Sequence, residues 1–407
     1  MGGCGQSISS GKLTGCVDAS RTTFLITAFL FTQLFTQSAF AQEEPERLAI
    51  PQANVLDRAT WKKLDASVEQ GLAWLATQQQ EDGSFKTIES GQPAITALCL
   101  MAFLAQGESP VNGKRQEQLS KAIEYIVKQQ KPNGLISTAA PAAVPIPRTR
   151  SLVGETASYN HAISALALTE AYGQCNAEQA KTMMPAIEKA IAATVEMQNW
   201  AGKRIIDEGG WRYLDVRYEN GDSDLSLTSW HLMFLRSARN AGFDPPVKSI
   251  EAGAQYVENC FLNQEDRQVH AYMPGERWKC TPAMAAAGVL ALAHAGKHNS
   301  KEAKLSGDWI LKHDFSNYFD DTPPYGVGHT KQYHYGAALC SQAMFQLGSK
   351  YWKQFFPVMV KAMVANQNAD GSWPAERREK KYGQCYSTAL SILSLSVPNQ
   401  MLPIFQR

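Results

Sequence analysis

The sequence predicts an all-α fold, an α/α toroid of six helical hairpins, from three observations. Charged, amphipathic helices alternate along the chain with helices that are apolar almost all round. A spacing of glutamine, glycine and an aromatic or aliphatic residue recurs where charged helices end. Glycines stop the apolar helices at Gly107, Gly173, Gly242, Gly296 and Gly348. No alternation typical of strands persists after residue 60.

The two kinds of helix predict two layers. The amphipathic kind includes "WKKLDASVEQGLAWLATQQ", "RQEQLSKAIEYIVKQQ" and "FFPVMVKAMVANQ". The apolar kind includes "PAITALCLMAFLAQG", "TPAMAAAGVLALAHAG" and "YSTALSILSLSV". An apolar helix has to be buried on every side because it has no polar face. Thr281 and Pro282 open one such helix with a capping hydroxyl followed by proline, and Pro398 stops the last.

The count and spacing of the helices predict a ring. Six outer–inner pairs follow one another at a period of about 50 to 70 residues, longer than the period of short helical repeats. A closed ring buries all six inner helices, whereas an open array leaves two unprotected ends. Glycine just past a helix end supplies the left-handed cap that other residues adopt at a cost.

The first 60 residues are expected to lie outside the ring. An apolar run at 22–35 follows Lys12 and Arg21 and precedes a small-residue cleavage site, Ala39-Phe40-Ala41. We therefore expect a signal peptide at 1–41, a linker at 42–60 and one toroid domain at 61–407. The run is too short to favour a membrane span, so export to the periplasm or to the medium is expected.

Composition limits the classes of partner. Lys plus Arg number 39 and Asp plus Glu number 38, so the chain lacks the basic excess of a nucleic-acid-binding protein. Export implies an oxidising compartment for the cysteines that follow the signal peptide. Cys99 and Cys340 lie in apolar runs as core thiols, and Cys260 and Cys280 flank one connection as the expected disulfide. The absence of a C-x-x-C spacing gives no support to a structural zinc site.

The recurring spacing also carries a family resemblance. "ANQNADGSW", "TQQQEDGSF", "KQQKPNGLI" and "EMQNWAGKRIIDEGGW" place a glutamine before a glycine turn. They resemble the Gln-Trp repeats of terpene cyclases such as squalene-hopene cyclase, whose ring fold the protein prenyltransferase β-subunits share. The resemblance covers about four of six repeats. Repeat four keeps Gln264 without the glycine turn, and repeat five lacks the pattern.

The repeat residues are expected to be structural. In the resembling family the glutamine bonds backbone at a neighbouring helix end, and the aromatic residue packs beside it. An amide side chain has the donors and acceptors that unpaired helix ends require. Gln367 and Trp373 are therefore expected to be clamps, and the chemistry has to come from other residues.

One short stretch suggests acid catalysis. "GDSDLSLTSW" (221–230) resembles the Asp-x-Asp-Asp-Thr motif of class II terpene cyclases, with Asp222 and Asp224 at the first two acidic positions. The resemblance implies that Asp224 protonates an alkene or epoxide. Leu225 stands at the third acidic position and Ser226 at the threonine. Asp224 is also a good helix N-cap, and we favour that role; one residue can serve both.

A cavity is expected where the inner helices start, under the long connections from the outer layer. Aromatic faces near these starts suit a carbocation or a lipid. The predicted lining consists of Trp211, Trp230, Trp278, Tyr333, Tyr335 and Tyr386, with Tyr213 nearby. His161 and His231 are further candidates, although a core or capping role is favoured for each histidine. Glu170, deeper in the helix of His161, is expected to have a backbone or serine partner.

Metal and cofactor chemistry have little support in the sequence. The zinc site of protein prenyltransferases uses an aspartate two residues before a cysteine, and a later histidine. Trp278 precedes Cys280 at that position and Gly383 precedes Cys385, so we expect no metal and no cofactor.

Three functions remain open. The first is a terpene cyclase-like exported protein that binds a polyprenyl or triterpenoid-like lipid in its central cavity, with acid-initiated isomerisation and peripheral membrane contact as further expectations. The second is a non-catalytic lipid-binding or scaffold toroid. The third is a carbohydrate-active six-hairpin enzyme, which needs two facing carboxyls. The loop residues available for that pair are Asp207, Glu208, Asp215, Asp320 and Asp321.

Overall fold

The computed structural model describes residues 55–138, 148–199, 203–214, 222–277, 279–318, 332–375 and 379–406. The described elements belong to one compact unit, Leu48–Arg407. This part of the chain contains twelve α-helices, several short 3-10 turns and one two-stranded sheet. The all-α prediction is therefore confirmed, with one exception given below. The expected signal peptide lies outside the described residues.

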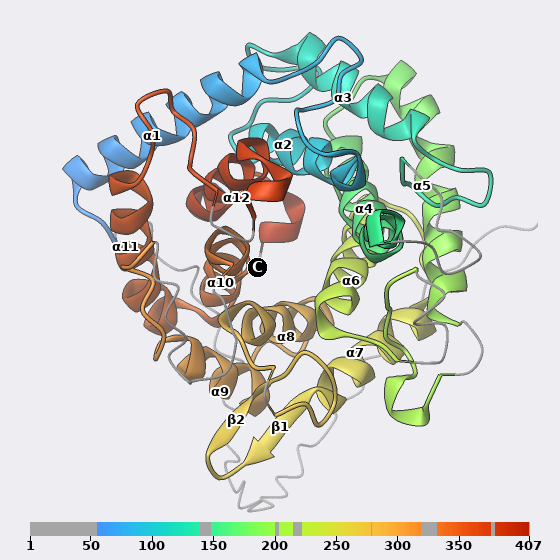
Figure 1. The fold of residues 1–407 in the computed structure, drawn as a ribbon, viewed down its shortest axis with the longest axis vertical. Helices are drawn as coiled ribbons and strands as arrows, with labels where there is room; N and C mark the ends of the chain where they lie inside the picture. Colours follow the sequence, from blue (N-terminus) through green and yellow to red (C-terminus); the bar gives the residue numbers. More distant parts are fainter. Residues whose placement is uncertain are drawn as a thin grey trace, which may run out of the picture. The chain divides into compact units, whose positions relative to one another are not determined.

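The apolar helices form an inner layer (Figure 1). They are α2 (Ala94–Leu104), α4 (Arg148–Tyr172), α6 (Leu225–Asn240), α8 (Pro282–His294), α10 (Tyr333–Leu347) and α12 (Gln384–Ser396). Each contacts the next in chain order, and α12 contacts α2. Every residue of α2 is buried, as expected for a helix without a polar face.

The amphipathic helices form an outer layer. They are α1 (Arg58–Thr77), α3 (Gln116–Lys128), α5 (Ala177–Gln198), α7 (Val247–Asn259), α9 (Lys301–Ile310) and α11 (Ser349–Ala365). Each packs chiefly against the inner helix that precedes it in the chain, and α1 packs against α12. The outer–inner pairs were counted in chain order from the outer helix, whereas the closest packing joins each inner helix to the outer helix that follows it. The connections from inner to outer helices are the short ones, so these consecutive helices pack together.

The repeat glutamines clamp neighbouring outer helices. Gln79 Nε2 donates to Gly83 O in its own turn at 3.0 Å and to Gln118 O of α3 at 2.8 Å. Gln367 Nε2 does the same with Gly371 O and Ser67 O of α1, both at 2.8 Å, and so joins α11 to α1. The two remaining pairs of acceptors are Gly134 O with Ala186 O for Gln130, and Gly209 O with Ser249 O for Gln198. The structural role expected for Gln367 is confirmed.

The glycine of each clamp fits against the same outer helix, one turn further on. At Gly209, φ is +83°, and an added Cβ would lie 2.1 Å from Ala252 O. At Gly83, the corresponding distance to Lys121 O is 2.2 Å. Ala252 and Lys121 each follow the glutamine's acceptor by three residues. Only glycine fits both the backbone conformation and the space.

An inner-helix side chain then accepts from the residue after the turn. Thr96, Thr228 and Thr388 Oγ1 accept from the backbone N–H of Phe85, Trp211 and Trp373 at 2.9, 3.1 and 3.0 Å. In repeat two this acceptor is His161, whose Nδ1 accepts from Ile136 N at 3.0 Å. His161 therefore occupies the place that threonine occupies elsewhere.

Repeat four differs from the expectation. Gln264 ends strand β1 (Phe261–Gln264), which pairs antiparallel with β2 (Arg267–His270), and its side chain is exposed. Two expectations were therefore wrong, namely that the chain has no strands and that Gln264 acts as a repeat glutamine. This turn lacks the glycine and continues as a hairpin. His270 links β2 to α9 instead: Ser306 Oγ lies 2.8 Å from its Nδ1. In repeat five, Tyr351 Oη donates to Lys304 O at 3.3 Å and joins α11 to α9.

Several smaller expectations are settled by the structure. Gly107, Gly242, Gly296 and Gly348 adopt positive φ, whereas Gly173 does not. Cys260 and Cys280 are free thiols, so the expected disulfide is wrong. Cys280 Sγ donates to Arg277 O at 3.6 Å, and Cys260 is fully buried at the end of α7.

Glu170 has the partners that its burial requires. Ser237 Oγ donates to one carboxylate oxygen, and Ile404 N donates to the other at 3.1 Å. Ile404 belongs to the C-terminal turn η6 (Pro403–Phe405), which also contacts α6. Burial raises the pKa of Glu170 to about 7. The expectation of a serine or backbone partner is confirmed.

Candidate ligand-binding cavity

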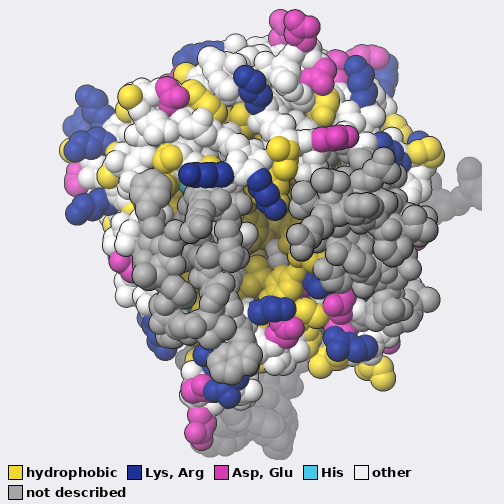
Figure 2. All heavy atoms as spheres, in the orientation of Figure 1, with side chains coloured by type: hydrophobic (Ala, Val, Ile, Leu, Met, Phe, Trp, Pro, Cys, Tyr) yellow, Lys and Arg dark blue, Asp and Glu magenta, His cyan; other side chains and the backbone are white. Residues whose placement is uncertain are grey.

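A cavity of about 460 Å³ lies among the N-terminal halves of the inner helices. Each of the six inner helices contributes at least one lining residue. Figure 2 shows hydrophobic side chains gathered in a hollow near the middle of this face of the molecule. The location agrees with the expectation from the helix pattern, because the inner helices begin here.

One part of the wall is apolar. It consists of Ile95 and Leu98 from α2, Ile163 from α4, Met284 from α8 and Leu390 from α12. Aromatic rings of Tyr382 and Tyr386 lie beside it, with their ring centroids 5.3 Å apart. This part of the wall can bury hydrocarbon but offers no acid or base.

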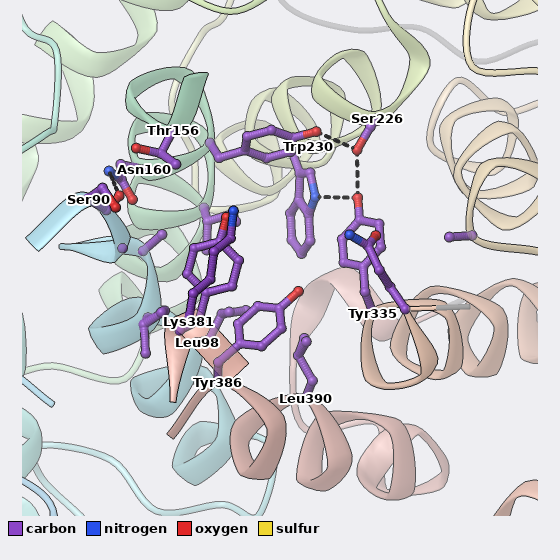
Figure 3. A pocket seen from close by; sticks show the side chains of 18 of the residues that line it. Ser90, Leu98, Thr156, Asn160, Ser226, Trp230, Tyr335, Lys381, Tyr386 and Leu390 are labelled. Atoms are coloured by element: carbon purple, nitrogen blue, oxygen red, sulfur yellow. Dashed lines mark hydrogen bonds between the residues drawn. The ribbon is translucent and has the colours of Figure 1, made fainter. Parts of the chain in front are cut away.

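The opposite part of the wall carries a hydroxyl cluster, which we define as Tyr159, Ser226, Trp230 and Tyr335 (Figure 3). Tyr159 Oη donates to Ser226 Oγ at 2.8 Å, and Ser226 Oγ lies 2.8 Å from Tyr335 Oη. Trp230 Nε1 donates to Tyr335 Oη at 3.0 Å. Burial raises the pKa of Tyr335 to about 12, so the phenol stays protonated at neutral pH.

A charged layer lies behind this wall. Arg212 Nη1 donates to Asp224 Oδ2 at 2.8 Å and to Tyr272 Oη at 2.7 Å. Arg212 Nε also lies 3.2 Å from Asp222 Oδ1. Tyr272 Oη is 2.8 Å from Tyr213 Oη, and both tyrosines line the cavity. The guanidinium therefore positions two wall tyrosines and two carboxylates together.

Asp224 is the N-cap of α6, as the sequence favoured. Its Oδ1 accepts from Leu227 N at 2.9 Å, and its Oδ2 accepts from Arg212. The side chain is fully buried and does not line the cavity. Burial raises the pKa of Asp224, and the Arg212 guanidinium opposes that rise. Asp222 is also absent from the described cavity wall.

The other predicted residues divide into two groups. Trp230, Tyr335 and Tyr386 line the cavity. Four others lie in the surrounding core, namely Trp211, His161, His231 and Tyr333. Trp278 lies outside the described residues.

Each core residue has structural contacts. Trp211 Nε1 donates to Thr194 O at 2.8 Å, and its ring stacks on His231 with centroids 5.0 Å apart. Tyr333 Oη donates to Phe315 O at 2.8 Å. The His231 Nε2 atom lies 3.1 Å from Ser158 Oγ. These contacts fit the core role favoured for His231 and place Trp211 and Tyr333 in the core instead of the predicted lining.

Several lining residues were not predicted from the sequence, including Tyr159, Tyr272, Tyr382, Asn160, Lys279 and Lys381. A signal exists for some of them. On α2, α4, α6 and α12, the lining positions include the residues two before and two after the residue that caps the clamp turn. On α4 this rule identifies Tyr159 and Ile163 around His161. The signal requires knowing the capping residue, which only contacts reveal.

Carboxylates are absent from the described part of the cavity wall, which contains no Asp or Glu. Within the described ranges, no three His, Cys, Asp or Glu side chains converge as metal ligands. The described helices also include none with the length and apolarity needed to cross a bilayer. Asp215, Asp320 and Asp321, considered above for a carbohydrate site, lie outside the described residues.

Comparison with known proteins identifies the fold. No family model matches the chain, and no curated protein matches it. A variant of type II terpene cyclase MstE from Scytonema, in complex with geranylgeranyl dihydroxybenzoate, is similar in structure. Its TM-score is 0.51 at 14% identity, over 85% of this chain and 100% of that one.

Glycoside-cleaving enzymes are similar to about the same degree. A glycosidase variant has a TM-score of 0.55 at 10% identity, over 86% of this chain and 100% of that one. An α-amylase from Clostridium perfringens has a TM-score of 0.51 at 13% identity, over 85% of this chain and 99% of that one. At such identities the likeness concerns the fold alone. The chain therefore has a mostly helical, α/α-toroid-like fold of the kind seen in a type II terpene cyclase and in glycosidases.

Proposed function

We propose that this chain is an exported α/α toroid of six hairpins that binds a polyprenyl- or triterpenoid-like lipid in its central cavity. The observation that carries the proposal is the composition of the wall. Aromatic and aliphatic side chains from all six inner helices surround about 460 Å³, and the described wall contains no carboxylate. That volume falls within the range of about 300–1,000 Å³ common for small-molecule sites.

The physical basis is burial of hydrocarbon. An isoprenoid chain gains about 25 cal/mol for each Å² of apolar surface removed from water. The faces of Trp230, Tyr335 and Tyr386 add contacts that suit alkene π-systems. MstE, the terpene cyclase of similar fold, was solved with a geranylgeranyl-bearing substrate, which supports a ligand of this class.

Catalysis by Asp224 is the stricter form of the proposal. A class II mechanism needs a protonated carboxyl that reaches the substrate. Asp224 lies behind the wall with both oxygens engaged, and its link to the cavity runs through Tyr272. Lipid binding without acid catalysis therefore has the stronger support. The carbohydrate-active alternative rests on the glycosidases of similar fold and on loop carboxylates outside the described residues.

Native mass spectrometry and lipid extraction of purified residues 42–407 test the binding proposal. A co-purifying isoprenoid is expected. Ala283 lines the cavity on α8, so Ala283→Phe should fill it and abolish the bound lipid. Ala192→Phe, on the exposed face of α5, is the matched control and should retain the lipid. Binding to a polysaccharide in place of any lipid would favour the carbohydrate alternative.

Incubation with squalene tests the catalytic form. The Asp224→Asn variant keeps a good N-cap, so the fold should survive the change. A cyclised product from the wild type that is lost in the variant would support Asp224 as the acid. Unchanged squalene with both proteins removes the cyclase hypothesis and leaves the binding proposal intact.

A further inference from the structure

The hydroxyl cluster has more donor hydrogens than hydrogen bonds among its members. Tyr159, Ser226 and Tyr335 each carry one O–H hydrogen, and Trp230 carries one N–H hydrogen. The structure forms three hydrogen bonds among these four side chains. One hydrogen is therefore left without an acceptor in the described part of the chain.

The pattern of hydrogen bonds shows which residues can carry the hydrogen that has no acceptor. Tyr159 donates to Ser226, and Trp230 donates to Tyr335. The bond between Ser226 and Tyr335 uses the hydrogen of one hydroxyl and leaves that of the other. The free donor thus belongs to Ser226 or Tyr335, and both line the cavity (Figure 3).

The second set of wall hydroxyls differs in this respect. Tyr272 receives a hydrogen bond from Arg212 and interacts with the carboxylate of Asp224, which is an acceptor. Tyr213 bonds to Tyr272 in turn. That set bonds to charged groups, whereas the three hydrogen bonds of the hydroxyl cluster join neutral side chains. A purely hydrocarbon ligand excludes water from this donor and offers no acceptor, which costs free energy, whereas a ligand oxygen accepts from it.

We propose that the hydroxyl cluster recognises an acceptor oxygen, so that the ligand is an oxygenated isoprenoid. The oxygen, as a hydroxyl, carbonyl or ether, accepts from Ser226 or Tyr335, and the hydrocarbon skeleton packs against Ile95, Leu98 and Leu390. This inference rests on the proposed lipid-binding function and narrows its ligand. A pure hydrocarbon leaves the donor unpaired, and a site with a buried polar group discriminates against such a ligand.

A pair of probes tests the inference. Geranylgeraniol and the hydrocarbon of the same carbon skeleton are titrated into the delipidated protein, and binding is followed by native mass spectrometry. We expect the alcohol to bind about tenfold more tightly or better. Equal affinity for the two probes would overturn the inference while leaving the lipid-binding proposal standing. Binding of neither probe would remove both.

A variant that lacks the three hydroxyls tests whether these side chains produce the preference for the alcohol. Tyr159→Phe, Ser226→Ala and Tyr335→Phe combined remove three oxygens with little change of shape and leave only the Trp230 N–H. The alcohol preference should fall to about threefold or less, with hydrocarbon binding retained as evidence of an intact cavity. Tyr333→Phe removes a buried hydroxyl outside the cavity and should keep the full preference. A full preference in the combined variant would show that other groups provide it.

Discussion

The two helical layers contain two kinds of repeat that hold their outer helices in different ways. Repeats one, two, three and six, with clamp glutamines Gln79, Gln130, Gln198 and Gln367, are called the clamped repeats here. In each of them one glutamine and one glycine turn contact the next outer helix. Repeats four and five, the unclamped repeats, use a β-hairpin, the His270–Ser306 contact and the Tyr351 hydroxyl. The inner helices nevertheless contact one another continuously through both. Packing of the apolar helices therefore holds the inner layer together, and the clamps fix how the outer layer packs on it.

The same comparison separates structure from function. Clamp residues such as Gln367 and Trp373 bond to backbone and lie away from the cavity. Tyr335 and Met284, which line the cavity, come from the unclamped repeats. Ser226 and Trp230 come from a clamped one. The recognisable motif thus reports the fold and does not indicate where the ligand binds.

The substitution with the largest expected effect replaces the glycine of a clamp. Gly209→Ala should lower the free energy of unfolding by about 4 kcal/mol, because the new Cβ meets a helix carbonyl and φ is positive. Gly275, in unclamped repeat four, also has positive φ but has nothing within 4 Å of an added Cβ. Gly275→Ala should therefore cost only about 1 kcal/mol. Urea unfolding of both variants measures the difference; equal losses would show that the clamp packing is unimportant.

The second prediction concerns acid sensitivity in clamped repeat two. His161 Nδ1 accepts from Ile136 N, so the ring is neutral, and burial lowers its pKa from 6.5 to about 4. Between these values the unfolded chain binds a proton that the folded chain does not. The contribution of the neutral His161 ring to stability is thus fully present above pH 6.5 and is lost as the pH falls through about 4. The difference amounts to about 3 kcal/mol.

His161→Thr installs the capping residue of the other clamped repeats and sharpens the comparison. It should remove most of this acid sensitivity, although the smaller side chain lowers stability at neutral pH. The measurement is the change in unfolding free energy between pH 7.5 and pH 4.5 for variant and wild type. An unchanged acid sensitivity would assign the loss to other buried groups.

The substitution with the smallest expected effect removes the side-chain amide of one clamp glutamine. Gln198→Ala deletes two buried hydrogen bonds to Gly209 O and Ser249 O and should cost about 2 kcal/mol. Gln264→Ala, at the exposed end of β1, should change stability by less than about 0.5 kcal/mol. Chemical denaturation compares the two. A similar cost at both sites would contradict the distinction between clamped and unclamped repeats.

Much of the fold was predictable because it depends on local pattern. The apolar sequence of α2 required burial on every side, and Thr281 with Pro282 marked the start of α8. Asp224 was identified as an N-cap from the same local rules. The hairpin at Phe261–His270 was missed because its strands have only four residues each and lack a clear alternation. The thiols of Cys260 and Cys280 looked pairable by sequence alone, but both are free in the structure.

The cavity was less predictable, because the distance along the chain from clamp to cavity varies. The clamp N–H and its inner-helix acceptor are separated by 11 residues in repeat one, 25 in repeat two, 17 in repeat three and 15 in repeat six. Tyr335 and Trp230 could be named from their nearness to helix starts. Tyr159 and Tyr272 could not, since no fixed spacing relates them to a motif.

The sequence alone determined the alternation of apolar and amphipathic helices, the positions of the clamps and the caps, since each depends on residues near one another in the chain. Tertiary structure decided which side chains meet across the ring. The hydroxyl cluster joins residues of α4, α6 and α10, and Arg212 joins Asp224 to Tyr272. Hydrogen bonds act over about 3 Å, so they depend on where the helices pack and not on how far apart their residues lie in sequence.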